Sequence, residues 1–456
     1  MGTKVKPRKV VGNCSLYLGD AARVLRVLPA GSVQACVTSP PYWGLRSYLA
    51  NDHADKQLEL GTEKTPQEYV ARLVQVFRRA RRLLHATGTL WVNVGDSYAG
   101  GGRGVGGRLQ KTNKGSDVNP IDVPPGLTAG QLCGVPWLFA EAMRTDGWRL
   151  RADCIWVKLS PMPESVSGWR WEQCRRKTQA SRGAKPGSKH DAAPIGGGYG
   201  ARKGGEFASK AKWEPCPGCP KCEPHGGLVL RKGRGRPTRA HEYLFLFAKS
   251  DRYFYDLEAS KQPARLETVM RDRYTWVLDD PEEQFAVQHD HETQCHGMAN
   301  ARSWLVFKGE SLKEKHYAAY PPGLPEFCIR ASTSSKGQCP YCGMPWARVA
   351  DTVGHDPHQK KGYTAGTGAR RDGDRLGHYT DGVTKTLGWR SCCACPPHEP
   401  VPQLVLDPFN GAGSTGVACV RAHRRYAGVD LNADYLDMAA RRLSKAWGKR
   451  GLGLFT

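Results

Sequence analysis

The sequence predicts an α/β protein whose main sheet is mostly parallel. Strand-like apolar runs alternate with amphipathic helices in the first third of the chain and again over 403–446, and this alternation is typical of βαβ units. The chain has 456 residues, which is enough for two or three domains and at least one large core. Its 53 glycines and 31 prolines indicate long irregular segments between the regular ones.

The N-terminal elements carry the clearest local signals. Residues 10–37 are expected to form a strand, a helix and a second strand. The strongest helix is predicted over 65–85, because Thr65 is a good N-cap and Glu68 completes a capping box with it. A buried strand is predicted over 89–94.

Later elements follow the same alternation. A helix is predicted over 135–147, and strands are predicted over 153–158 and 242–247. The segment 403–446 is expected to form a strand, a glycine-rich turn, a helix, a strand and a helix. We therefore expect the main domain in two halves, 10–160 and 398–446. Between them we expect a basic insert with a cysteine cluster (161–300), a segment that leads into the second half (301–334) and an insert bounded by cysteine pairs (335–397).

The charge indicates a polyanionic partner. Formal net charge is +24, and residues 161–240 hold 17 Lys/Arg against 6 Asp/Glu. A basic, loop-rich block inside a globular chain favours a nucleic-acid surface. The sequence has no apolar run of membrane-spanning length and no secretory signal, so we expect a cytoplasmic protein without a membrane partner. In that reducing compartment, the clustering among the 16 cysteines indicates metal ligands rather than disulfides.

A glycine pattern near the C-terminus predicts a cofactor site. Gly411, Gly413 and Gly416 open a predicted helix directly after a strand, and Asp430 ends the next strand. Such glycines let the backbone approach a ligand, and an acid at that distance can accept the hydroxyls of a ribose. No lysine precedes Ser414, which disfavours a phosphate-binding P-loop. A nicotinamide dinucleotide and S-adenosylmethionine both fit this pattern.

The stretch Thr38-Ser39-Pro40-Pro41-Tyr42-Trp43 follows a predicted strand. Paired prolines cannot continue a central strand, so a stiff segment with a hydroxyl and two aromatic rings begins there.

Together these stretches resemble the DNA amino-methyltransferases, which methylate cytosine N4 or adenine N6. Thr38–Tyr42 resembles their catalytic motif, and Asp407-Pro408-Phe409-Asn410-Gly411-Ala412-Gly413 resembles their S-adenosylmethionine motif. The order of the motifs resembles the permuted β class, as does His316–Leu324, which in that class helps to enclose the methionine end. The resemblance covers roughly 10–170 and 300–445. It implies a Rossmann-like, S-adenosylmethionine-dependent methyltransferase sheet with circularly permuted motifs.

The chemistry of amine methylation agrees with the motif. An exocyclic amine is a poor nucleophile, and two acceptors on its hydrogens free its lone pair. The Ser39 hydroxyl and the Pro40 carbonyl can supply them, and the stiff Pro40-Pro41 backbone keeps that carbonyl aimed. Tyr42 offers a face for the extruded base, and Trp43 a further wall. Cytosine C5 methylation would need a cysteine nucleophile, which in the C5 family stands in a Pro-Cys pair. It is disfavoured here, because the one Pro-Cys step in the sequence, at Cys216, belongs to a cysteine cluster.

The resemblance assigns the cofactor to one set of residues: Asp407, Pro408, Phe409, Gly411, Gly413, Asp430 and His316. A serine before the paired prolines is more frequent in the N4-cytosine members, so Ser39 favours cytosine over adenine. Weaker expectations are that Asp96 and Tyr98 line the base pocket and that Lys158 contacts phosphate.

Two cysteine clusters have spacings typical of structural zinc. The first is Cys216, Cys219, Cys222 and His225, which is crowded for one ion, so that Cys174 could replace one of them. The second is Cys339, Cys342, Cys393 and Cys395, with Cys392 as a competing ligand, and resembles a zinc ribbon.

The expected partner is double-stranded DNA. Whether a restriction endonuclease accompanies the protein is left open. The alternatives are an NAD-dependent oxidoreductase, a catalytically inactive zinc DNA-binding protein and an RNA methyltransferase.

Overall fold

The structure, a computed structural model, describes residues 6–44, 47–100, 123–159, 161, 166, 168–177, 213–233, 235–263, 298–307, 320–353 and 383–451. The chain divides into two compact units. The larger unit holds residues 1–160 and 240–456, and the smaller unit is Pro161–Arg239. The insert expected over 161–300 is therefore too long at its C-terminal end, because the strand that begins at His241 pairs within the main sheet.

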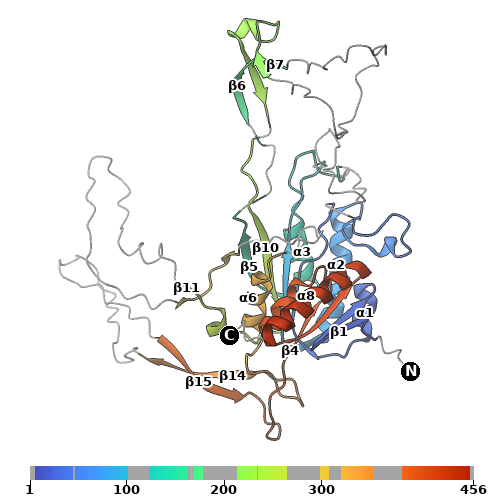
Figure 1. Cartoon of the computed structure of the whole chain (residues 1–456), viewed down its shortest axis with the longest axis vertical. Coiled ribbons are helices and arrows are strands. Elements are labelled where there is room, and N and C mark those ends of the chain that lie inside the picture. Colours follow the sequence, from blue (N-terminus) through green and yellow to red (C-terminus); the bar gives the residue numbers. More distant parts are fainter. Residues whose placement is uncertain are drawn as a thin grey trace, which may run out of the picture. The chain divides into compact units, whose positions relative to one another are not determined.

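The larger unit is built on a sheet of nine strands among the described residues (Figure 1). In spatial order they are β1 (Lys9–Val11), β2 (Cys14–Leu18), β17 (Arg425–Asp430), β16 (Leu404–Asp407), β3 (Val33–Thr38), β4 (Leu84–Val94), β10 (His241–Ala248), β5 (Arg149–Val157) and β13 (Trp304–Val306). From β2 to β4 every neighbour is parallel, whereas β10 runs antiparallel to both β4 and β5. The predicted mostly parallel sheet is confirmed, and it places β16 and β17 between strands from the N-terminal region.

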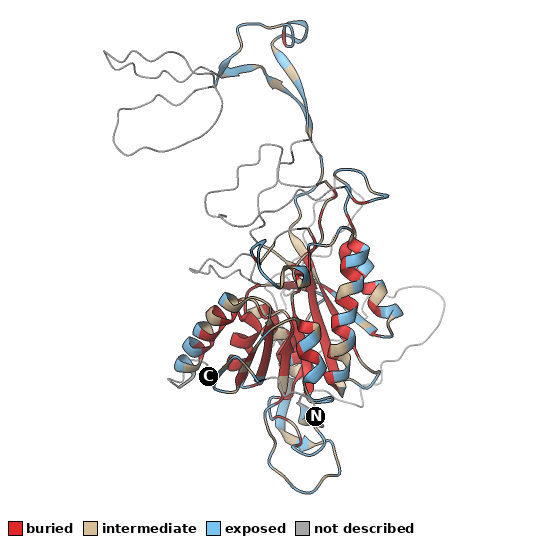
Figure 2. Ribbon diagram, turned by 90° about the vertical axis from the view of Figure 1, so that its right-hand side faces the viewer, coloured by how far each residue is buried: buried red, intermediate tan, exposed pale blue. Residues whose placement is uncertain are grey.

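Helices cover both faces of this sheet. One face packs on α1 (Ala21–Val27), α2 (Pro66–Leu83) and α3 (Val135–Thr145), and the other on α6 (Gly323–Ser332), α7 (Ser414–Arg421) and α8 (Ala433–Gly451). Strand β3 shows why both faces must be covered: Val33 and Cys36 enter the first core, and Ala35 and Val37 enter the second. Figure 2 accordingly shows the sheet as buried between the helices.

Most predicted elements are found within a few residues. The Thr65 hydroxyl accepts the Glu68 N–H at 3.2 Å, as the capping box predicts. The strand expected over 89–94 begins earlier, so that α2 passes into β4 without an intervening turn, where the pairing of β4 with β3 is irregular. The predicted strand–helix–strand–helix order over 403–446 is confirmed by β16, α7, β17 and α8.

Short elements complete the larger unit. The hairpin of β14 (Trp346–Val353) and β15 (Val383–Ser391) belongs to the insert expected over 335–397, of which 354–382 lie outside the described residues. The remaining elements are η1 (Lys56–Leu58), α4 (Leu257–Ser260), β11 (Gln262–Pro263) and β12 (Met298–Ala299).

The smaller unit contains two antiparallel strand pairs among its described residues. Strand β6 (Trp169–Gln173) pairs with β9 (Leu228–Lys232), and β7 (Arg175–Lys177) pairs with β8 (Trp213–Pro215). A short helical turn, η2 (Glu223–His225), precedes β9. In both units, the helices that the structure describes include none with the length and apolar character needed to span a bilayer.

Candidate active site

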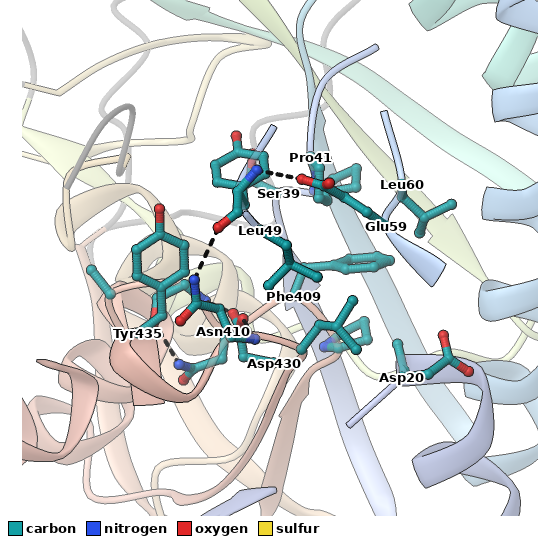
Figure 3. Close-up of a pocket in the computed structure, with 18 of the residues that line it drawn as sticks. Asp20, Ser39, Pro41, Leu49, Glu59, Leu60, Phe409, Asn410, Asp430 and Tyr435 are labelled. Atoms are coloured by element: carbon teal, nitrogen blue, oxygen red, sulfur yellow. Dashed lines mark hydrogen bonds between the residues drawn. The ribbon is translucent and has the colours of Figure 1, made fainter. Parts of the chain in front are cut away.

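A cavity of about 1040 Å³, including space open to solvent, lies at the carboxyl ends of β3, β16 and β17. Ligand sites commonly lie at the carboxyl ends of parallel strands, where the loops that leave neighbouring strands diverge. Figure 3 shows that its lining includes Ser39 and Pro41 from the loop after β3, Phe409 and Asn410 from the loop after β16, and Asp430 at the end of β17. Two motifs far apart in sequence therefore share one cavity.

The Ser39 hydroxyl is held against the end of β4. Its Oγ lies 3.3 Å from the Asn93 carbonyl oxygen and 3.3 Å from the Tyr42 hydroxyl. Since one proton serves either contact, the oxygen keeps lone pairs that can accept from a ligand. The following backbone is also fixed, because the Tyr69 hydroxyl donates to the Pro41 carbonyl at 2.7 Å.

A buried carboxylate joins the two motifs. Asp407 accepts from the Thr38 hydroxyl at 2.6 Å, from the Thr415 hydroxyl at 2.7 Å and from the Phe409 N–H at 3.0 Å. It is 1% exposed and is not among the residues that line the cavity. Burial raises its pKa to about 6. Asp407 was expected to hold the cofactor directly, whereas its oxygens here bind the chain's own donors and fix the loop that forms the cavity wall.

The glycines of the same loop have different tasks. Gly411 lines the cavity, and its N–H donates to Asp430 at 2.6 Å. Gly413 adopts a φ of +76°, and a Cβ there would lie 2.8 Å from the Cβ of Ala439 on α8. Gly413 is therefore required for the turn and its packing, and it does not line the cavity as Gly411, Pro408 and Phe409 do.

Asp430 presents a carboxylate to the cavity. Its Oδ2 accepts the Gly411 N–H and its Oδ1 accepts the Asn432 N–H at 2.8 Å. Burial raises its pKa to about 6. Because each carboxylate oxygen has a second lone pair, the group can still accept two hydroxyls of a ligand.

A polar cluster behind Tyr42 was not predicted from the sequence. The Tyr42 hydroxyl donates to Glu242 at 2.6 Å, and the Asn93 side-chain amide donates to the same carboxylate at 2.7 Å. Lys158 forms an ion pair with its other oxygen. A Cβ at Gly95 would lie 2.5 Å from the Tyr42 ring, so the ring packs directly on the backbone after β4. The only local sequence signal for this cluster was Glu242 itself, an acidic residue at the start of the otherwise apolar strand predicted over 242–247.

This cluster keeps Tyr42 neutral. Burial, followed by the neighbouring Glu242 carboxylate, raises the pKa of Tyr42 well above its usual value. The phenol therefore remains a hydrogen-bond donor at physiological pH and is held in one orientation at the cavity wall.

Several weaker predictions are corrected. Trp43 is 2% exposed and donates to the Glu63 carbonyl, so it is part of the core rather than a wall of a base pocket. Asp96 accepts the N–H groups of Gly134 and Val135 at the start of α3 and acts as a helix cap. Lys158 pairs with the buried Glu242 carboxylate, which makes it part of the Tyr42 cluster.

The segment expected to enclose the methionine end is described only in part. His316 lies outside the described residues. Tyr320 lines the cavity, and its hydroxyl is hydrogen-bonded to the Thr415 hydroxyl. This bond connects the segment before α6 to the loop held by Asp407.

Both cysteine clusters gather in space. The thiols of Cys339, Cys342, Cys393 and Cys395 all lie within 4.8 Å of one another, and Cys392 is outside this group. In the smaller unit the gathered thiols are those of Cys174, Cys216, Cys219 and Cys222. The ring nitrogens of His225 are outside this group, and the His225 ring packs against that of Trp171 with the centroids 4.8 Å apart. Cys174, which the sequence offered as an alternative ligand, therefore lies in the group in place of His225.

The chain belongs to the N6/N4 family of DNA methylases, whose model matches residues 33–344 and 398–441. It is 28% identical over 435 residues to the type II methyltransferase M.XycI of Xanthomonas campestris pv. cyanopsidis, covering 95% of this chain and 89% of that protein. It is 27% identical to the type II methyltransferase M.Cfr9I of Citrobacter freundii over 95% of this chain and 88% of that protein.

Shorter and more distant similarities are also found. A segment of 43 residues, 9% of this chain and 15% of the relative, is 40% identical to the DNA adenine methyltransferase YhdJ of Escherichia coli strain K12. Among solved structures, the cytosine-N4-specific PvuII DNA methyltransferase is 14% identical with a TM-score of 0.44, covering 97% of this chain and 94% of that one.

Proposed function

We propose that the protein is a site-specific type II DNA methyltransferase that transfers a methyl group from S-adenosylmethionine to an exocyclic base amine, cytosine N4 in preference to adenine N6. The observation that carries this proposal is the shared cavity: Ser39-Pro40-Pro41-Tyr42 and the Phe409–Gly411 loop line it together. Family membership supports the same chemistry and leaves the nicotinamide alternative without support. The position of β3 early and β16 late in the chain supports the permuted motif order.

The cofactor side of the cavity fits a nucleoside. The Asp430 carboxylate is proposed to accept the ribose hydroxyls, which its position in the cavity lining together with Phe409 and Gly411 supports. His316 is proposed to enclose the methionine end. When bound, S-adenosylmethionine supplies an electrophilic methyl group on a sulfonium.

The amine side is formed by the loop after β3. Ser39 and the Pro40 carbonyl accept hydrogen bonds from the target amine, which localises the nitrogen lone pair for attack. Tyr42 stacks against the extruded base, held by Glu242 through its hydroxyl. The preference for cytosine rests on Ser39 in the position before the paired prolines.

The partner and setting extend the proposal. The basic insert is proposed to contact double-stranded DNA and contribute to target recognition, as the excess of Lys/Arg over 161–240 suggests. A cytoplasmic location and a role in restriction–modification are part of the proposal. We also propose structural Zn²⁺ at Cys339, Cys342, Cys393 and Cys395, since four thiolates leave no open position for a catalytic water.

Mass spectrometry of nucleosides tests the proposal. DNA from a host that expresses the protein is expected to contain N4-methylcytosine, and mapping the modified positions would give the recognition site. N6-methyladenine instead would keep the mechanism and reverse the preferred base. Unmodified DNA from a host with abundant folded protein would favour the inactive DNA-binding alternative, and 5-methylcytosine would contradict the mechanism. Modified RNA with unmodified DNA would favour the RNA alternative.

Binding of S-adenosylhomocysteine is expected to weaken as the pH falls through about 6. Burial raises the pKa of Asp430 to about 6, and only its carboxylate can accept both ribose hydroxyls. Below that pH the Kd should rise by at most about tenfold per pH unit, because one proton is linked to binding. Titration calorimetry between pH 5 and 8 measures this dependence.

The control separates Asp430 from Asp407, whose pKa burial also raises to about 6. In Asp430→Asn the Kd should be higher at pH 8 and nearly independent of pH. An unchanged dependence of the Kd on pH in that variant would assign the pH effect to another group.

The stability of the ligand-free protein should change with pH in the opposite direction. A carboxyl group whose pKa is raised in the folded protein contributes to the free energy of unfolding. This contribution is fully present below the pKa of the unfolded chain, about 3.9, and is lost as the pH rises through about 6.

A further inference from the structure

We propose that Cys174, Cys216, Cys219 and Cys222 form a structural zinc site that fastens the two strand pairs of the smaller unit to each other. Cys174 lies between β6 and β7, and Cys216 directly follows β8. One ion held by all four thiolates would therefore join the β7–β8 pair to the segment that leads into β9. The site is independent of methyl transfer.

The sulfur geometry suits zinc. The Cys219 and Cys222 sulfurs are 3.5 Å apart, those of Cys174 and Cys219 are 3.9 Å apart, and all four lie within 4.8 Å of one another. A zinc–sulfur distance of about 2.3 Å gives sulfur–sulfur separations of roughly 3.8 Å in a tetrahedron. A disulfide would need about 2.05 Å, and all four cysteines are free.

The backbone holds the cysteines in this arrangement. The Cys216 N–H donates to the Cys174 carbonyl at 2.9 Å, and the Cys174 N–H donates to the Gly227 carbonyl at 2.8 Å. The Cys222 N–H donates to the Cys219 carbonyl at 3.0 Å. Cys174 is thus bonded to the cluster through its backbone, although it is 42 positions from Cys216 in the sequence.

The unit has little else to stabilise it. Among its described residues, Cys222 is the single hydrophobic side chain that is fully buried, whereas Trp169, Trp171 and Trp213 are exposed. Small domains without an apolar core commonly depend on a metal, whose binding free energy becomes folding free energy. Four thiolates fill the coordination sphere of zinc, so the role is structural.

Metal analysis of the full-length protein tests the ligand set. By plasma mass spectrometry, Cys174→Ser is expected to lose one equivalent of zinc per chain relative to the unmodified protein. His225→Ala and Cys392→Ser are expected to retain the full content, because neither side chain belongs to a gathered group. Zinc lost by His225→Ala and kept by Cys174→Ser would overturn the assignment, as would iron in place of zinc or an unmodified chain that binds no metal.

Cobalt substitution gives a second measurement that does not depend on yield or solubility alone. With Co²⁺ in place of zinc, the thiolate-to-cobalt absorption should be weaker in Cys174→Ser than in the unmodified protein. It should fall by the contribution of one thiolate if the ion stays bound and by that of all four if the ion is lost. In His225→Ala it should not change. An unchanged spectrum in Cys174→Ser would contradict the proposal. Thermal unfolding of the larger unit at its normal temperature in each variant would show that the loss is local.

Discussion

Alanine in place of Ser39 is expected to lower the single-turnover rate of methyl transfer to DNA about 100-fold, a typical loss when one preorganised hydrogen-bonding group is removed from an active site. The Ser39 oxygen lines the cavity and is oriented by the Asn93 carbonyl and the Tyr42 hydroxyl. In the proposed mechanism it accepts one amine hydrogen, and a methyl group cannot replace it. Single-turnover assays with labelled S-adenosylmethionine measure the rate of the chemical step.

The affinity for S-adenosylhomocysteine should be nearly unchanged in the same variant. The proposed nucleoside contacts come from the loops after β16 and β17, and Asp407 still fixes the first of them through Thr38 and Thr415. Ser32→Ala is the matched control, because the Ser32 hydroxyl bonds the Pro29 carbonyl in an exposed turn. A Ser39→Ala enzyme with more than half of the normal rate would contradict the assigned role.

The two motifs could be predicted from the sequence because their signals are local. Paired prolines end a central strand because they lack the N–H that its ladder needs, and a glycine turn between a strand and a helix shows in a few adjacent residues. What could not be predicted is the division of work within a motif. Asp407 and Gly413 match the cofactor pattern, yet their contacts are with Thr38 and Ala439, which only the fold brings near.

The roles that were missed or corrected could not be predicted for one physical reason, which is that they depend on contacts between segments far apart in the sequence. Glu242 is buried against Tyr42, Asn93 and Lys158, which come from three other segments, so its role depends on the register of β10 against β4 and β5. Similarly, the sequence could not decide between His225, which fits a ligand spacing, and Cys174, because only the fold brings Cys174 into the cluster from 42 positions before Cys216.

Leucine in place of Glu242 is expected to have the largest effect on stability. The Glu242 carboxylate is the shared acceptor for the Tyr42 hydroxyl, the Asn93 amide and the Lys158 ammonium group. Removing it leaves the Tyr42 and Asn93 donors against an apolar side chain, and a buried donor left unsatisfied typically costs about 1–3 kcal/mol. The lost ion pair adds less, because the Lys158 side chain is 32% exposed. Denaturant unfolding of the larger unit measures the loss, and Glu141→Leu, which removes an exposed ion pair with Arg144, should cost about 1 kcal/mol or less.

A second substitution at the same position distinguishes a positioning role of Glu242 from a purely structural one. Glu242→Gln keeps the volume and one acceptor oxygen, so it should lose less stability than Glu242→Leu while Tyr42 loses its fixed orientation. We expect its kcat to fall about tenfold or more, with little change in S-adenosylhomocysteine affinity, since geometry at the reacting base is lost rather than cofactor contacts. Lys158→Met combined with Glu242→Leu should cost less stability than the two single changes added together, because no charge is then left unpaired. Additive losses would show that Lys158 and Glu242 are not coupled in stability. A Glu242→Gln enzyme with normal kcat would show that the orientation of Tyr42 does not depend on this carboxylate.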